Sequence, residues 1–114
     1  MWMIDPALLC RKHLLGEHGE LHKYRHTFDK QYRIEGRIAP VVQIEPASMA
    51  YRHDVLVQEM IARGYVHRSP YTQPDISYLP EDQQHVKVDP QQSLHDLCER
   101  CPECERRIHG RLHD

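Results

Sequence analysis

The sequence predicts a single compact all-α domain of about three helices joined by long irregular connections. Apolar residues recur at helical spacing in three separate segments, and glycine and proline residues divide those segments. The chain has 114 residues, of which 39% are hydrophobic and 28% charged. This composition is typical of soluble globular proteins, and the length allows one modest core rather than two. We therefore treat residues 1–114 as one domain.

The first predicted helix begins at Asp5-Pro6 and extends to about Phe28. Asp5 is a favoured N-cap residue, and proline is favoured at the first helical position. Gly16 and Gly19 each weaken a helix by about 1 kcal/mol relative to alanine, which indicates that something approaches the helix surface there. The apolar stripe that supports the helix consists of Ala7, Leu8, Leu14, Leu15, Leu21 and Phe28.

The second predicted helix covers about Ser48 to Arg63. An irregular stretch from residue 31 to residue 46 precedes it, and Gly64 supplies its C-terminal stop. Its expected apolar face consists of Met49, Leu56, Val57, Met60 and Ile61.

The remaining chain predicts a long loop followed by an interrupted helix. Residues 65–90 contain four prolines and three tyrosines, so we expect an ordered loop that wraps over the helices. The last helix begins near Asp89-Pro90. Pro102 must interrupt it, because proline lacks the amide hydrogen and clashes with the preceding turn.

A line of ionisable residues runs along the first helix. His13, Glu17 and Glu20 are spaced i, i+4 and i+7, so they lie one above the other, and Lys23 extends the same side. One interpretation is a solvated face with helix ion pairs. The other is acid–base chemistry, because stacked carboxylates drive each other's pKa values apart.

Three cysteines lie close together near the C-terminus. Cys98, Cys101 and Cys104 form a double C-x2-C pattern in a chain with four cysteines. Thiolates at this spacing suit tetrahedral zinc, so residues 95–109 form a candidate zinc-stapled segment with a structural role. The alternative is a set of reduced thiols without metal. The candidate metal ligands are Cys98, Cys101 and Cys104, with a fourth from His95, His109 or Cys10.

Histidines form a second candidate group. The chain has ten, and His18, His22 and His26 are spaced one turn apart on the first predicted helix. Histidines one turn apart can bind a transition metal, or they can form a polar face toward solvent or DNA.

The charge and hydropathy of the chain exclude several classes. The formal net charge is −2, so the chain is not a DNA-coating protein, and any contact with nucleic acid must come from a local basic patch. No run of eighteen apolar residues is available to span a membrane. The start of the chain has charges in and after its short apolar run, so we expect no secretory signal and a cytoplasmic location.

Three ordered blocks carry a resemblance to a known family. "HLLGEHGEL" fits H-L-x-x-E-x-x-E-L, "RHDVLVQEMIARGYVHRSPY" fits a second helix that ends in R-G-aromatic, and "DISYLP" fits a D-I-S-x-x-P turn. Together they resemble the phage pyrimidine-dimer DNA glycosylase family, the endonuclease V type of UV-repair enzyme. The resemblance covers roughly residues 1–80.

The resemblance implies an all-helical, metal-independent glycosylase with an associated abasic-site lyase. The family's nucleophile is the α-amino group of the protein, which attacks C1′ and forms a Schiff base. We assign it to Met1, because Trp2 is too bulky to favour removal of the initiator methionine. An α-amino group ordinarily has a pKa of about 7.7–8.0, so a useful fraction is unprotonated at neutral pH. The family's catalytic carboxylate falls on Glu20, its accompanying histidine and glutamate on His13 and Glu17, and its phosphate-contacting arginine on Lys23.

The chain also departs from the family pattern. Gly19 stands where the family has an arginine, and a cysteine-rich segment replaces the family's aromatic, basic tail. A different lesion or a modified base is therefore an alternative to the pyrimidine dimer. Arg63 and Arg68 either bind DNA or complement the end of the second helix. The expected DNA-binding residues are Arg11, Lys12, Lys23, Arg25, Arg63, His67, Arg68 and Tyr71, and Arg33, Arg37 and Arg52 are further cations for the same groove.

The sequence thus predicts a monomeric DNA N-glycosylase with abasic-site β-lyase activity. The expected substrate is a UV-damaged or otherwise modified pyrimidine in double-stranded DNA, in the cytoplasm of a bacterium or of a phage-infected host. Catalysis would need no cofactor, and a structural zinc ion is expected. The alternatives are a zinc-dependent nuclease that uses the histidine run, and a non-enzymatic zinc-stapled DNA- or protein-binding module.

Overall fold

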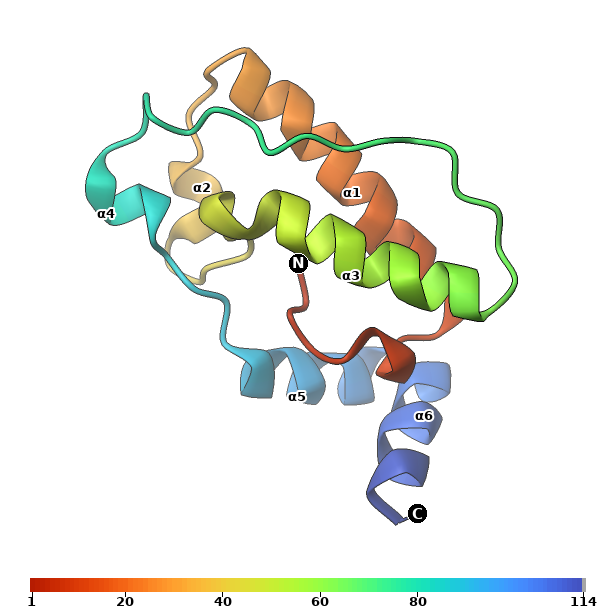
Figure 1. The fold of residues 1–114 in the computed structure, drawn as a ribbon. Helices are drawn as coiled ribbons and strands as arrows, with labels where there is room; N and C mark the ends of the chain where they lie inside the picture. Colours follow the sequence, from red (N-terminus) through yellow and green to blue (C-terminus); the bar gives the residue numbers. More distant parts are fainter. Residues whose placement is uncertain (114) are drawn as a thin grey trace.

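Two crossing helices, α1 (Arg11–Asp29) and α3 (Met49–Ala62), form the centre of the molecule (Figure 1). The computed structural model describes residues 1–113. That part of the chain is all-α and contains no strand, as predicted. None of its helices is long and apolar enough to cross a membrane. The other elements are η1 (Pro6–Leu8), α2 (Glu35–Ile38), η2 (Pro46–Ser48), α4 (Glu81–Gln84), α5 (Pro90–Arg100) and α6 (Pro102–His113).

The third predicted helix is two helices in the structure. Pro102 begins α6 directly after Cys101, whose backbone is extended (φ −136°, ψ 106°), so the chain changes direction between α5 and α6. Asp89 caps α5 as expected, since its side chain accepts a hydrogen bond from the amide of Gln91 at 3.0 Å. The sequence therefore locates the break correctly.

The first helix begins later than the sequence predicts. Asp5 does cap a helical turn, and its side chain accepts a hydrogen bond from the amide of Ala7 at 3.0 Å, but that turn is the short 3-10 helix η1. Leu9 and Cys10 are then extended, and α1 begins at Arg11. This interruption buries Leu9 completely and lets the amide of Cys10 donate to Sγ of Cys104 at 3.3 Å. Tertiary packing thus overrides the local signal for a longer helix.

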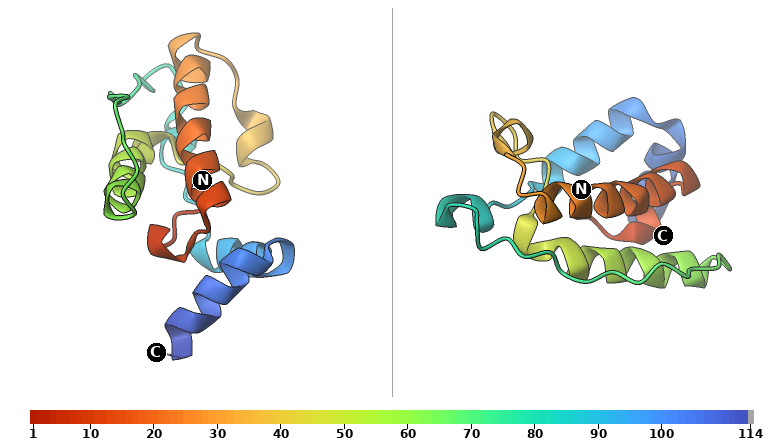
Figure 2. Two further views of the ribbon diagram at one scale, coloured as in Figure 1. Left: turned by 90° about the vertical axis from the view of Figure 1, so that its right-hand side faces the viewer. Right: turned by 90° about the horizontal axis from the view of Figure 1, so that it is seen from above.

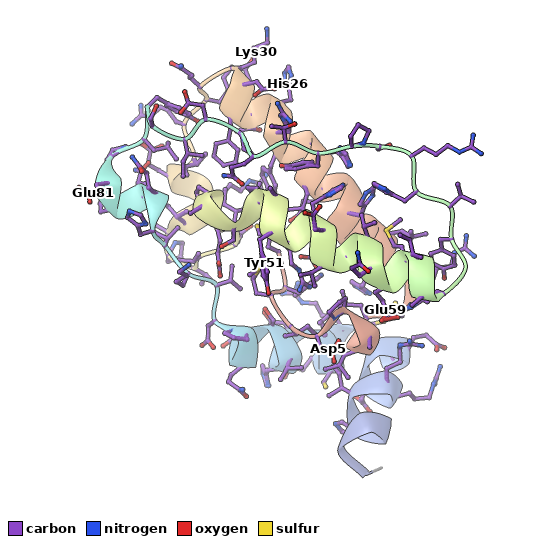
Figure 3. The ribbon with its side chains drawn as sticks, in the orientation of Figure 1. Asp5, His26, Lys30, Tyr51, Glu59 and Glu81 are labelled. Carbon is purple, nitrogen blue, oxygen red and sulfur yellow. The ribbon has the colours of Figure 1, made fainter. Side chains whose placement is uncertain are left out.

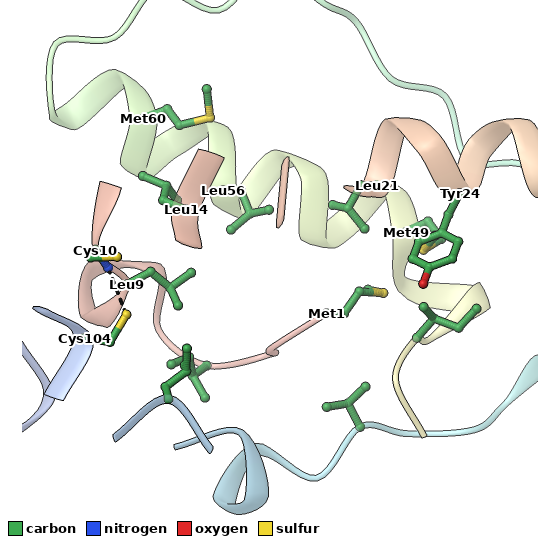
Figure 4. Packing of buried hydrophobic residues seen from close by; sticks show 14 of the residues in the cluster. Met1, Leu9, Cys10, Leu14, Leu21, Tyr24, Met49, Leu56, Met60 and Cys104 are labelled. Carbon is green, nitrogen blue, oxygen red and sulfur yellow. Dashed lines mark hydrogen bonds between the residues drawn. The ribbon is translucent and has the colours of Figure 1, made fainter. Parts of the chain in front are cut away.

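The core forms where α1 packs on α3 above α5 and α6 (Figure 4). Leu14, Leu21 and Phe28 of the predicted stripe are buried on α1. They are part of the same apolar cluster as Met49, Leu56 and Met60 of α3 and Leu97, Cys104 and Ile108 of α5 and α6. Ile61 is a correction to the predicted face of α3, because 56% of its surface is exposed.

The N-terminal segment passes between the α1–α3 pair and α5 (Figure 1). The side chain of Met1 is completely buried, and its Sδ accepts a hydrogen bond from the amide of Glu45 at 3.2 Å. Figure 4 shows Met1 in the core between the helices. Burial of this side chain fixes the position of the α-amino group.

Residues 65–80 form an extended segment that we call the strap, and it crosses α1 and runs along α3 (Figures 1 and 2). The hydroxyl of Tyr71 donates to the carbonyl of Leu21 at 3.0 Å. The side chain of Gln73 donates to the carbonyl of Pro46 at 2.8 Å and accepts from the amide of Ala50 at 2.9 Å. The strap is therefore an ordered loop, as predicted, whereas the rest of the predicted loop of residues 65–90 includes the short helix α4.

Candidate active site

The α-amino group of Met1 lies against a carboxylate at the wall of a cavity. It donates to Oε1 of Glu20 at 3.0 Å and to the carbonyl of Gln43 at 2.9 Å. The cavity has a volume of about 780 Å³. Its walls are apolar, cationic and acidic in different places, and they include Trp2, Tyr24, Val41, Arg37, Lys87, Arg100, Asp89 and Asp96. An amine, a carboxylate and open space beside both are thus held together.

A second hollow of about 590 Å³ adjoins the first, because Glu20, Tyr24 and Arg37 line both. Lys23, Arg33, Gly16 and Gly19 line this second hollow. A Cβ atom added at either glycine would meet nothing within 4 Å, so the space over this part of α1 is open. The two glycines therefore leave the helix surface next to Glu20 uncovered. This agrees with the expectation that something approaches the helix there.

The three members of the ionisable line have three different environments. Glu20 contacts the Met1 amine, Glu17 is buried against Arg52, and His13 lies among cysteine thiols. Of the three, only Glu20 lines the cavities, with 42% of its side chain exposed. The line is thus neither a uniform solvated face nor a uniform catalytic wall.

Glu17 and Arg52 form a buried, bidentate ion pair that joins α1 to α3. Nε and Nη2 of Arg52 donate to the two carboxylate oxygens of Glu17 at 2.7 Å and 3.0 Å. The remaining guanidinium nitrogen of Arg52, Nη1, donates to the carbonyl of Ile4 at 2.7 Å, and the amide of Trp2 donates to Glu17 at 3.3 Å. Arg52, a predicted DNA cation, is thus buried, with only 3% of its surface exposed. The pair holds the N-terminal segment that carries the Met1 amine.

Arg52→Ala should lower the free energy of unfolding by about 3–5 kcal/mol, because it leaves the Glu17 carboxylate buried without a counter-charge. Chemical denaturation followed by circular dichroism measures this loss. Arg33→Gln is the matched control, because Arg33 is 88% exposed in its ion pair with Glu35, and such pairs contribute about 0–1 kcal/mol.

The double variant Glu17→Leu/Arg52→Leu separates charge from packing. Replacing both partners removes the uncompensated charge, so it should recover much of the stability that Arg52→Ala loses. Equal losses in the single and double variants would contradict this explanation.

A second group, which we call the thiol cluster, consists of Cys10, His13, Cys101 and Cys104. One ligand atom from each lies within 4.8 Å of the others. Sγ of Cys10 is 3.2 Å from Nδ1 of His13 and 3.7 Å from Sγ of Cys101, and Sγ of Cys104 is 3.6 Å from Nδ1 of His13. Three thiols and one imidazole in this arrangement can hold a structural metal ion.

The thiol cluster includes three of the six predicted metal ligands. Cys98 instead lies with its Sγ 4.0 Å from Nε2 of His109, and His95 is 3.2 Å from Glu99. The fourth ligand position is filled by His13, which the sequence analysis assigned to catalysis. Its spacing from Cys10, C-x2-H, is the signal that could have identified it.

Against the effect of burial, hydrogen bonds with Cys104 and Cys10 lower the pKa of the Cys101 thiol, whereas burial dominates at Cys104. Burial raises the pKa of the Cys104 thiol to about 12, because a thiolate in the core lacks solvation. Burial, with a smaller contribution from Lys12, lowers the pKa of His13 and so favours its neutral form. Coordination to a cation would deprotonate the thiols of the cluster. It would also need the imidazole of His13 in its neutral form.

The predicted DNA-binding residues divide into exposed cations and residues with structural contacts. Lys12, Lys23 and Arg68 are exposed. Arg11 lies over the ring of Tyr65. Arg63 donates to Glu59 and to the carbonyls of Pro6 and Leu9, so it secures the end of α3.

Three more of these residues lie at the strap. Arg25 donates to the carbonyl of Thr72 at 2.7 Å, and the hydroxyl of Tyr71 is bonded to α1. His67 packs against His18, with their Nε2 atoms 3.0 Å apart. All three therefore join the strap to the helices.

The histidine run is split in the structure. His18 and His22 join His53 of α3 and His67 of the strap in a group that we call the histidine cluster. His26 is exposed near Lys30 at the far end of α1 (Figure 3) and is not part of this group. The sequence analysis missed His53, because its partners on α1 are 31 and 35 positions away along the chain and His67 is 14 positions away.

An all-α protein that holds an α-amino group against a carboxylate at an open cavity has the arrangement that an amine-nucleophile enzyme requires. The family comparison adds independent information on the class of protein. The family model for pyrimidine dimer DNA glycosylases matches residues 1–73, and the chain belongs to this family. The match includes Met1, Glu20, Gln43 and the whole of α1 and α3. Comparisons with curated proteins and with solved structures gave no match.

Proposed function

We propose that this protein is a DNA N-glycosylase with abasic-site β-lyase activity, and that the amine of Met1 is its nucleophile. The observation that carries the proposal is the 3.0 Å contact between the Met1 nitrogen and Oε1 of Glu20 at the wall of the larger cavity. The burial of the Met1 side chain supports retention of this residue, since its loss would empty a place in the core. The family membership supports a damaged pyrimidine as the substrate class.

The chemistry follows from these two groups. Glu20 accepts a proton from the Met1 amine, and the nitrogen lone pair then attacks C1′ of the nucleotide. A bond forms between nitrogen and C1′, and the glycosidic bond breaks, so that the base leaves with its electron pair. Protonation of the sugar ring oxygen opens the ring and gives an imine. Loss of a proton from C2′ then expels the 3′ phosphate, which is the β-lyase step.

The two adjoining hollows suit a nucleotide turned out of the duplex. A volume of about 780 Å³ is within the range of pockets that enclose small ligands. Enzymes that act on a base must turn it out of the duplex. The uncovered surface at Gly16 and Gly19 would let the DNA backbone come close to Glu20. Lys23, Arg33 and Arg37 line the second hollow and supply cations for the phosphates.

The proposed substrate is a UV-damaged or otherwise modified pyrimidine in double-stranded DNA. Arg37 lines both hollows, so it can contact a phosphate on either side of the exposed nucleotide. We expect the enzyme to act as a monomer on DNA in a bacterial or phage-infected cytoplasm.

We also propose that the thiol cluster binds a structural Zn²⁺. Three sulfurs and one nitrogen complete a tetrahedron and leave no position for the water that a catalytic zinc needs. This closed set favours a structural ion, which joins the start of α1 to the α5–α6 junction, over a catalytic ion at this cluster. The glycosylase and lyase steps would then need no metal.

Borohydride trapping on abasic-site duplex DNA tests the lyase proposal. The protein should form a covalent adduct, because borohydride reduces the imine to a stable amine. Peptide mass spectrometry should place the modification on the α-nitrogen of Met1. The same measurement reads the N-terminal residue of the protein used.

Selective acetylation of the α-amino group is the control. The acetylated protein should bind the duplex but give no adduct and no strand cleavage, since an amide nitrogen is not a nucleophile. Undiminished cleavage by acetylated protein, or an adduct on a lysine, would exclude Met1 as the nucleophile.

A further inference from the structure

The histidine cluster brings together four imidazoles from three parts of the fold. His18 and His22 come from α1, His53 from α3 and His67 from the strap. One ring nitrogen from each lies within 4.8 Å of the others, and the Nε2 atoms of His18 and His67 are 3.0 Å apart. Four ligand nitrogens in tetrahedral zinc are separated by about 3.4 Å, given a Zn–N distance of about 2.0–2.1 Å. The four rings thus need only small side-chain movements to surround one ion.

Two nitrogens in this cluster are buried without a partner. Among residues 1–110, whose side chains the structure describes, Nε2 of His22 and Nε2 of His53 are the only buried side-chain nitrogen or oxygen atoms that have no hydrogen bond. Only 2% of the surface of His53 is exposed. A buried polar atom without a partner costs about 1–3 kcal/mol, so two beside each other need an explanation. A metal ion among the four rings would satisfy both.

The surroundings of His53 resemble those of a metal ligand. Nδ1 of His53 is 3.2 Å from Oδ1 of Asp54, which orients the ring and leaves Nε2 directed into the protein. Metal-binding histidines usually donate their second ring N–H to such a carboxylate. The ring of Tyr71 stacks on His53 with its centroid 4.7 Å away and an interplanar angle of 19°, so it covers one side of the cluster.

We propose that the histidine cluster is a second metal site, in which four neutral imidazoles bind a divalent transition-metal ion. The ion that we expect is Zn²⁺. Imidazole nitrogens suit this class of ion, and no thiolate or carboxylate of the cluster competes for it. The ion would join α1, α3 and the strap at one point. It would hold the strap, which carries Arg68 and Tyr71, in place over the two helices.

This site is distinct from the amine site. His18 and Glu20 are separated by about 200° around α1, as are His22 and Glu20, so the two sites lie on opposite sides of the helix. The inference is therefore independent of the proposed glycosylase chemistry. The metal site can prove wrong while the glycosylase chemistry proves right, and the glycosylase chemistry can prove wrong while the metal site proves right.

Metal counting on the untagged full-length protein tests the proposal. Native mass spectrometry and elemental analysis of protein loaded with Zn²⁺ should give two zinc ions per chain, one in each cluster. His67→Gln should retain one, because it removes the ligand on the strap and leaves the thiol cluster intact. His26→Gln is the matched control and should retain two, since His26 is a neighbouring histidine of α1 that is outside the cluster.

A single zinc ion in the wild-type protein that His67→Gln does not remove would overturn the proposal. Two zinc ions in both proteins would overturn it as well, because the second ion would then lie elsewhere. His18→Gln keeps the test decisive if His67→Gln fails to fold, since it removes another ligand from the same cluster.

Cobalt substitution identifies the ligands by another route. Co²⁺ in the thiol cluster should give a thiolate charge-transfer band, and Co²⁺ in the histidine cluster should give visible ligand-field absorption without that band. Cys101→Ser should therefore lose the charge-transfer band and retain visible absorption that His67→Gln loses. No visible cobalt absorption in Cys101→Ser with a native circular dichroism spectrum would count against the histidine site.

Discussion

Glu20→Gln should slow adduct formation and strand cleavage on abasic-site DNA by about 10²–10⁴-fold, the usual contribution of a positioned acid–base group. The amide cannot take the proton of the Met1 amine, although it keeps the size of the carboxylate and can still accept the 3.0 Å hydrogen bond. Single-turnover kinetics with borohydride trapping measures the loss. Because 42% of the Glu20 side chain is exposed, the variant should fold normally.

Glu81→Gln is the matched control for this result. Glu81 is an exposed glutamate at the start of α4, away from the amine site (Figure 3), so its replacement should leave the rate unchanged. Binding of the uncleaved duplex should be nearly equal in both variants, because Glu20 contributes no positive charge to the phosphates. A Glu20→Gln protein that cleaves at the wild-type rate would remove the carboxylate from the mechanism.

The sequence predicts the helices well and the start of α1 poorly. Local signals determine that α3 ends shortly before Gly64 and that Pro102 divides α5 from α6, since these depend only on neighbouring residues. Asp5-Pro6 is an equally good local signal, but it begins only the 3-10 turn η1. The burial of Leu9 and the contact of Cys10 with Cys104 decide the outcome, and both depend on residues at the other end of the chain.

The candidate site shows the same division between local and distant information. Helical spacing correctly places His13, Glu17 and Glu20 on one side of α1, yet it does not state what each of them faces. Arg52 and Met1, the partners of Glu17 and Glu20, lie 35 and 19 positions away, and His13 contacts the distant Cys104 as well as the nearby Cys10. The resemblance to the glycosylase family assigned all three to one site, whereas the fold gives each a separate neighbourhood.

The two proposed metal sites differ in how readily the sequence reveals them. The C-x2-C spacing of Cys101 and Cys104 is a local signal that predicts the thiol cluster. The histidine cluster has only the pair His18 and His22 in local register, and a pair of histidines one turn apart is common on solvated helices. Its other two members come from α3 and the strap, and only the packing of these three segments assembles it.

Removal of metal from the thiol cluster should strongly destabilise the protein. A site occupied at a metal concentration a thousand times its Kd stabilises the folded state by about 4 kcal/mol. For a chain of this size that corresponds to a fall in Tm of roughly 10–20 °C. Thermal unfolding of Cys101→Ser, compared with zinc-loaded wild-type protein, measures the effect. The variant should also lose one zinc ion per chain.

Cys98→Ser is the control that separates metal binding from the loss of a cysteine. Cys98 lies in the same C-x2-C pattern but is outside the thiol cluster, so its replacement should keep the zinc ion and nearly all of the Tm. Equal losses in Cys98→Ser and Cys101→Ser would contradict the assignment of ligands. Unlike Glu20→Gln, Cys101→Ser leaves the amine and its carboxylate intact. Below its lowered Tm it should therefore still form the borohydride adduct, since the proposed ion would have no open position for substrate and would act only on the fold.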